Sequence, residues 1–141
     1  MPMDTMQVLL VEDNPDDEFL ALRALRRQGM DKVVVARDGE EALAYLLGPG
    51  CPERGGGVLE PSFILLDLKL PKINGIEVLR ALRGDERTSR IPVIVISSSR
   101  EESDLRCCRE LDVLCCLTKP VDGKEILDIL GKSGLLDTSP F

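Results

Sequence analysis

Five short apolar runs alternate with segments that carry helix signals along this chain. The runs are rich in Val, Ile and Leu and are continuous rather than alternating, which is typical of strands buried on both faces of a parallel sheet. We expect strands at residues 8–11, 33–36, 63–66, 92–96 and 113–117. Because crossovers between parallel strands are right-handed, this strand-helix order predicts a doubly wound (βα)5 fold of the α/β class.

The expected helices have recognisable ends. Asn14 supplies an N-cap, Pro15 suits the first helical position, and Gly29 is typical of a helix stop. The pattern predicts helices at about residues 14–28, 38–47, 75–83 and 101–111, with a fifth after residue 122. Segment 48–61, rich in Gly and Pro, is typical of a surface loop. We expect a single domain over residues 1–141, with its core at about 6–131.

Three carboxylates and one lysine stand where apolar runs end. Glu12 and Asp13 follow the first run, Asp67 follows the third, and Lys119 follows the fifth. In one parallel sheet these side chains meet at the carboxyl edge, where open α/β sheets bind ligands. The sequence therefore predicts a binding site at that edge.

A cluster of three acids needs a cation, because two carboxylates about 4 Å apart repel by roughly 4 kcal/mol at an effective dielectric constant near 20. Oxygen ligands without His or thiolate suit Mg2+ better than zinc or copper. Mg2+ held by a few carboxylates commonly completes its shell with waters and substrate phosphate. We therefore expect Mg2+ and a phosphate at this site.

The composition limits which partners the protein can bind and which cell compartment it can occupy. A net charge of -7 without a basic run argues against nucleic acid and anionic membranes as partners. Residues 1–6 are too short and polar for a signal peptide, and no apolar stretch approaches the ~20 residues that span a bilayer. We expect a cytoplasmic protein.

Five cysteines include the adjacent pairs 107–108 and 115–116, but the chain has no CxxC motif and no His. This pattern indicates neither a disulfide framework nor a zinc site. We expect reduced, mostly buried thiols rather than a redox function, because free Cys commonly behaves as a small apolar residue.

The polar residues at the strand ends also resemble a family. Glu12-Asp13, Asp67, Ser97 and Lys119-Pro120, in this order, resemble the receiver domain of two-component response regulators over nearly the whole chain. Segment 66–75 resembles the family's segment around its phosphorylated aspartate. Segments 11–17, 91–99 and 117–120 resemble the single-domain regulators paired with bacterial phytochromes. The resemblance implies the flavodoxin-like, CheY-like fold, with strand order 2-1-3-4-5 and no output domain.

The resemblance implies a role for each site residue. Asp67 would accept a phosphoryl group from a phosphohistidine on a sensor histidine kinase. Mg2+ would be bound by Asp13, Asp67 and the backbone carbonyl of Lys69, while Glu12 would hold a metal-bound water. Lys119 would pair first with Asp67 and then with the phosphoryl oxygens. The protein would catalyse only its own phosphorylation and dephosphorylation and would not otherwise be an enzyme.

Ser97 would start the conformational switch by donating its hydroxyl to the phosphoryl group. A hydrogen bond to a charged group is worth about 1.5–3 kcal/mol, whereas moving a two-state equilibrium from 1:99 to 99:1 needs about 5.5 kcal/mol. Ser97, Lys119 and backbone donors near Ser98 would therefore have to act together.

Two positions near the end of the fifth run bear on this switch. The family usually has Tyr or Phe three residues before the lysine, where this chain has Cys116. A thiol is too small to replace that aromatic relay, so coupling would pass through backbone movement. The family's cis peptide before Pro120 would aim Lys119 inward.

Simpler interpretations exist for several residues. Asp16 and Asp17 are expected only to place negative charge at a helix start, and Ser97 could belong to a polar turn. One rival function is a pseudo-receiver, a binding module that acts without phosphorylation. Another is a Mg2+-dependent phosphohydrolase, but such enzymes need a carboxylate two residues after the nucleophile, where this chain has Lys69.

Without an output domain, the signal would leave by contact or by onward phosphotransfer. We expect a sensor histidine kinase, a downstream phosphotransfer or effector protein, and a second copy of the chain as partners. The expected contact surface is helix 101–111, strand 113–117 and the helix after residue 122, including Val113, Leu114 and Cys115.

Overall fold

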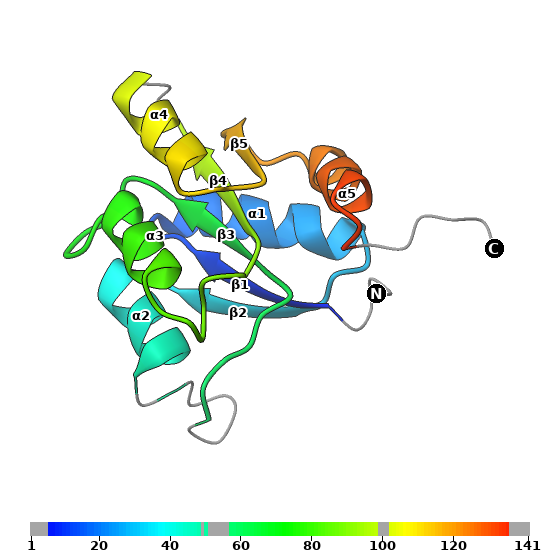
Figure 1. Ribbon diagram of the computed structural model, residues 1–141. Coiled ribbons are helices and arrows are strands. Elements are labelled where there is room, and N and C mark those ends of the chain that lie inside the picture. The colour runs from blue at the N-terminus through cyan, green and yellow to red at the C-terminus, as the bar shows by residue number, and fades with distance from the viewer. Residues whose placement is uncertain (1–5, 49, 51–56, 99–101, 136–141) are drawn as a thin grey trace.

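The computed structural model of the chain describes residues 6–48, 50, 57–98 and 102–135. Its strands are β1 (Gln7–Val11), β2 (Lys32–Ala36), β3 (Phe63–Asp67), β4 (Val93–Ser97) and β5 (Cys115–Thr118). Neighbouring strands all pair in parallel, in the order β2-β1-β3-β4-β5 (Figure 1). The expected doubly wound sheet and its strand order are confirmed.

Helices cover both faces of this sheet (Figure 1). They are α1 (Pro15–Arg27), α2 (Gly39–Leu47), α3 (Gly75–Arg83), α4 (Glu102–Glu110) and α5 (Gly123–Lys132). Helices α1 and α5 lie on one face, and α2, α3 and α4 lie on the other. Four of them begin at an Asn or Asp whose side chain accepts backbone N–H groups of the first turn: Asn14, Asp38, Asn74 and Asp122.

Two apolar cores form, one on each side of the sheet. In β1, Leu9 and Val11 pack beneath α2, α3 and α4, whereas Val8 and Leu10 pack beneath α1 and α5. All four side chains are completely buried. Burial on both faces explains why the apolar runs are continuous rather than alternating.

Strand β5 begins two residues later than the sequence pattern predicts. Asp112 adopts a φ of 58°, in the left-handed region, and the chain turns there directly after α4. Val113 belongs to this turn, and Leu114 makes the first contact with the sheet, through its N–H to the carbonyl of Val93 at 2.8 Å. Apolar pattern alone cannot separate the turn from the strand.

Arg83, the last residue of α3, ties two loops together. Its guanidinium donates to the carbonyl oxygens of Leu111 at 2.8 Å, Ile91 at 2.8 Å and Ser89 at 3.1 Å. The first acceptor precedes β5 and the other two precede β4. One half-buried side chain therefore links the chain segments that lead into both strands.

The four cysteines that the structure describes are free thiols. Cys108 alone among them is fully buried, while Cys107, Cys115 and Cys116 are half-buried, so the expectation of mostly buried thiols is wrong for three of the four. Glu101 and residues 49 and 51–56 of the expected loop, Cys51 among them, lie outside the described residues. None of the described helices has the length and apolar character needed to cross a membrane.

Candidate functional site

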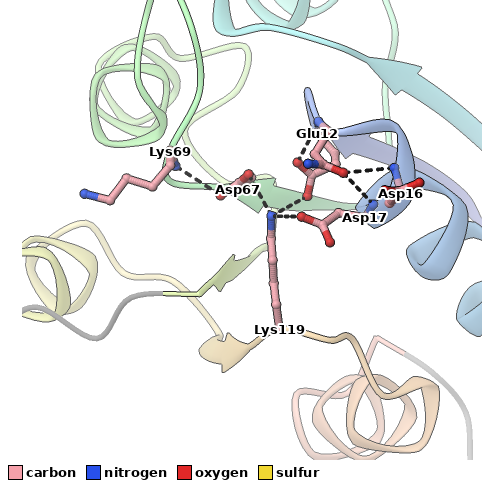
Figure 2. Close-up of polar contacts among 7 residues, drawn as sticks. Glu12, Asp16, Asp17, Asp67, Lys69 and Lys119 are labelled. Carbon is pink, nitrogen blue, oxygen red and sulfur yellow. Dashed lines mark hydrogen bonds and ion pairs between the residues drawn. The ribbon is translucent and has the colours of Figure 1, made fainter.

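The strand ends bring the expected polar residues to one edge of the sheet (Figure 2). Glu12 and Asp13 directly follow β1, and Asp67 is the last residue of β3. Ser97 ends β4, and Lys119 directly follows β5. Parallel pairing in register places these ends side by side, so the clustering follows from topology.

Lys119 reaches into the group of acids (Figure 2). Its Nζ donates hydrogen bonds to Asp17 Oδ2 at 2.9 Å and to Asp67 Oδ2 at 3.0 Å. Glu12 Oε1 lies 2.7 Å from the same nitrogen, an ion pair without the alignment of a hydrogen bond. The side chains of Glu12, Asp67 and Lys119 are 0%, 4% and 13% exposed. One ammonium group therefore contacts three carboxylates, two of them where water has little access.

Asp17 is the site residue that the sequence reasoning missed. It was expected only to charge the start of α1, and its contact with Lys119 corrects that interpretation. The available signal was its place in the first turn of α1, which begins directly after the strand end that carries Glu12 and Asp13. Asp16 is exposed, as expected for a residue that only charges the helix start, and its backbone N–H donates to Asn14 Oδ1.

The electrostatics of Glu12 and Lys119 follow from burial and pairing. Burial raises the pKa of Glu12 from 4.5 to about 7, and the charge of Asp67 adds to this, although Lys119 and the backbone N–H of Asn14 oppose it. Burial alone would lower the pKa of Lys119. Its contacts with Glu12, Asp17 and Asp67 outweigh burial and raise that pKa, so the lysine stays charged.

Glu12, Asp13 and Asp67 form a group that can hold a divalent cation. One carboxylate oxygen from each lies within 4.8 Å of the others. A set of oxygen donors without nitrogen or sulfur is suited to a hard cation such as Mg2+. The exposed carboxylate of Asp13 opens the group to solvent, which gives an ion a way in.

Lys69 supports Asp67 through its backbone. The N–H of Lys69 donates to Asp67 Oδ1 at 3.0 Å, while Lys119 holds the other oxygen. The Lys69 side chain points away from Asp67, and its Nζ lies 3.7 Å from Asp104 of α4 (Figure 2). The proposed metal contact of the Lys69 carbonyl stays a prediction.

The switch positions lie on the α4 side of the site. Ser97 is buried, and a cavity of about 10 Å3 is lined by Ser97, Cys116 and residues of α4. Ser98 is exposed, and the next three residues lie outside the described part of the chain, so the inward loop movement stays a prediction. The Lys119–Pro120 peptide is cis, in agreement with the resemblance.

Gly75 allows the loop after Asp67 to close tightly. A Cβ at this position would lie 2.5 Å from the carbonyl oxygen of Asp67 and 2.5 Å from Leu68 Cα. Only a residue without a side chain fits there. The first turn of α3 is consequently packed directly against the backbone that carries Asp67.

Comparison with known proteins identifies the class. Residues 8–131 match the response regulator receiver domain. Given this match over most of its length, the chain belongs to the family of response regulator receiver domains, which work in phosphorylation-based two-component signalling.

Individual relatives cover nearly the whole chain. The structure of the bacteriophytochrome response regulator AtBRR has a TM-score of 0.81 and 41% identity, covering 95% of this chain and 96% of that one. The structure of the Mn2+-bound response regulator Rcp1 has a TM-score of 0.74 and 34% identity, covering 96% of this chain and 98% of that one. In the sequence comparison, Rcp1 from Synechocystis is 37% identical over 87% of this chain and 82% of that protein. The probable methanogenesis regulatory protein FilR2 from Methanothrix harundinacea is 39% identical over 87% of this chain and 77% of that protein.

Proposed function

We propose that Asp67 is the phosphoacceptor and that this chain passes on a signal from a sensor histidine kinase. The observation that carries the proposal is the set of contacts made by the two oxygens of the Asp67 carboxylate. One oxygen is held by Lys119 and the other by the backbone N–H of Lys69, beside two further acids at the sheet edge. A carboxylate at the end of a central strand needs such partners, and phosphoryl transfer needs such charge and positioning.

In the proposed reaction an oxygen of Asp67 bonds to phosphorus while the phosphorus–nitrogen bond of a phosphohistidine breaks. The electron pair of that bond returns to the imidazole, and Asp67 becomes an acyl phosphate. Lys119 then shifts its hydrogen bond from Asp67 Oδ2 toward the new phosphoryl oxygens, with Asp17 and Glu12 keeping the ammonium at the edge. Asp13, Glu12 and Asp67 would hold Mg2+, which when bound neutralises charge on the phosphoryl group.

Ser97 would donate its hydroxyl to the phosphoryl group. Its place at the end of β4, beside the end of β3 that carries Asp67, supports this role. With about 1.5–3 kcal/mol from each hydrogen bond to a charged group, Ser97, Lys119 and backbone donors near Ser98 together supply the differential binding that a nearly complete switch needs.

The proposed partners follow from the family and from one surface. AtBRR, a bacteriophytochrome response regulator, resembles this chain over 95% of its length, which supports a phytochrome-type kinase as donor. A groove of about 530 Å3 lies between β5 and α5, where Leu114, Leu117 and Ile129 line its apolar floor. We propose the α4-β5-α5 surface for a second copy or a downstream protein.

The direct test is the intact mass of the protein after incubation with Mg2+ and acetyl phosphate. The parent should gain one phosphoryl group, and Asp67→Asn should gain none. Asp16→Asn is the matched control, because Asp16 is an exposed acid outside the group of contacts, and it should gain one as well. A parent that binds Mg2+ but gains no phosphoryl group would point to a module that acts without phosphorylation.

A further inference from the structure

Two adjacent pairs of cysteines lie on neighbouring elements of the proposed output surface. Cys107 and Cys108 belong to α4, and Cys115 and Cys116 begin β5. Packing separates the members of each pair. Cys108 and Cys116 both belong to the core beneath α2, α3 and α4, whereas Cys115 packs on the opposite face of the sheet. Cys107 lies near Arg80, whose Nη2 is 3.7 Å from its sulfur.

The thiols of Cys108 and Cys116 meet between the helix and the strand, in hydrogen-bond contact. Seven residues separate them in the chain, and the turn at Asp112 lies between them. A disulfide needs sulfurs about 2.05 Å apart and Cα atoms roughly 4.4–6.8 Å apart. Cys116 packs against the core that contains Cys108, so the two thiols are candidates for this bond.

We propose that Cys108 and Cys116 are a modification site, at which a peroxide oxidant forms a disulfide that ties α4 to β5. The reaction has two balanced steps. Cys116 attacks one peroxide oxygen, giving a sulfenic acid and water, and Cys108 then attacks the sulfenic sulfur, releasing a second water as the disulfide forms.

The environments of the two thiols assign these roles. Cys116 is half-buried whereas Cys108 is fully buried, so we assign the first reaction with the oxidant to Cys116. Cys108 is fully buried, and burial raises its pKa to about 12. It is therefore protected from direct oxidation and acts only as the resolving thiol.

The disulfide would restrain the element that the phosphorylation switch has to move. Cys116 occupies the position of the family's aromatic relay and shares a cavity with Ser97. Fixing α4 to β5 there would oppose the phosphorylated conformation, and because coupling between sites is reciprocal it would also slow phosphoryl uptake. This regulatory step rests on the proposed function, but the formation of the disulfide does not.

Peptide mapping tests the disulfide itself. The full chain is treated with hydrogen peroxide, remaining thiols are alkylated, and peptides are mapped without reductant. The parent should lose the mass of two hydrogen atoms and yield a crosslinked Cys108–Cys116 peptide that dithiothreitol separates. Cys107→Ser and Cys115→Ser, the chain neighbours, should keep the crosslink, while Cys108→Ala and Cys116→Ser should each abolish it. Oxygen addition alone, or a crosslink between other cysteines or between two chains, would overturn the proposal.

Phosphoryl uptake tests the regulatory step. The oxidised chain should gain the phosphoryl group from acetyl phosphate at least about fivefold more slowly than the reduced chain, at the lower end of typical couplings. Reduction, or the Cys108→Ala substitution before oxidation, should restore the rate. Equal rates in a chain with the mapped disulfide would overturn the coupling. Failure of the reduced chain to take up phosphate would instead count against the proposed function.

Discussion

At the scale of single residues, the site depends on how one lysine is shared. The Lys119 ammonium contacts three carboxylates, of which Glu12 and Asp67 are buried and the Asp17 side chain is 34% exposed. A single cation among three acids leaves a net negative charge, which favours a divalent ion. The three contacts are therefore not equivalent, and Asp17 can be removed with the least cost.

Replacing Asp17 tests its contact with Lys119. Asp17→Asn should lower the free energy of unfolding by about 1 kcal/mol, below the value for a buried charged hydrogen bond because solvent screens this partly exposed pair. Urea denaturation at neutral pH measures the change. Asp16→Asn, an exposed acid on the same turn, should change stability by less than about 0.5 kcal/mol. Equal effects of the two substitutions would show that Asp17 only charges the helix start.

Glu12 should make the stability of the metal-free protein depend on pH. Its pKa is 4.5 when unperturbed and about 7 in the folded chain, so between these values the folded state holds the proton and the unfolded state does not. Stability should fall as pH rises through this window, by roughly 3 kcal/mol in total. The stabilisation from the raised pKa of Lys119 is fully present below pH 10.5 and is constant over this range.

The Glu12→Gln variant isolates this effect. In EDTA, its unfolding free energy relative to the parent should increase from about pH 5 to about pH 8, because the glutamine cannot ionise. Urea denaturation across this range measures the difference, with Asp16→Asn as the control of unchanged pH dependence. Parallel profiles for parent and Glu12→Gln would contradict the burial effect on Glu12.

At the scale of elements, the residues at the turns explain which helix and strand bounds could be predicted from the sequence. Helix α3 was predicted with the bounds that the structure has, because Asn74, Gly75 and an apolar stripe mark it clearly. Strand β5 was placed too early, because the left-handed conformation of Asp112 leaves no trace in an apolar pattern.

The site residues at the sheet edge could be predicted because the carboxyl ends of parallel strands lie at one edge. This placed Glu12, Asp13, Asp67 and Lys119 together. Contacts made by side chains across elements, such as Asp17 with Lys119, depend on packing angles that the sequence does not state.

Arg83 offers a test at this scale. Arg83→Lys should lower the free energy of unfolding by about 1–3 kcal/mol, because an ammonium cannot reach the carbonyls of Leu111, Ile91 and Ser89 together. Amide exchange should rise most at Leu114, whose N–H joins the sheet next to this contact. Arg90→Lys, at an exposed arginine, is the control. Unchanged exchange at Leu114 would mean that Arg83 does not set the entry of β5.

At the scale of the whole molecule, the sheet separates two cores that lie beneath different groups of helices. The α2, α3 and α4 side contains Cys116 and Cys108, whereas the α1 and α5 side supports the groove at Leu114, Leu117 and Ile129. Strand β5 is one of the two edge strands of the sheet, and its residues contribute to both cores. A change at the acidic edge can therefore reach either face through one strand.

The prediction at the scale of the whole molecule concerns the groove between β5 and α5. Ile129→Glu should weaken self-association or partner binding by about tenfold or more, because it places a charge on the apolar floor. Analytical ultracentrifugation with and without acetyl phosphate measures self-association, and the intact-mass assay should show unchanged phosphoryl uptake. Lys124→Ala, an exposed change on α5 outside the groove lining, is the control. Intact self-association and intact partner binding in Ile129→Glu would exclude this surface.

The close packing of Gly75 has a mechanical consequence. Backbone atoms of Asp67 and Leu68 lie directly against Gly75, so the first turn of α3 is in close contact with the strand that carries the carboxylate. A displacement of that strand end would therefore press on the first turn of α3. The other end of this helix is where Arg83 holds the loops before β4 and β5, so we expect an event at Asp67 to be felt there as well.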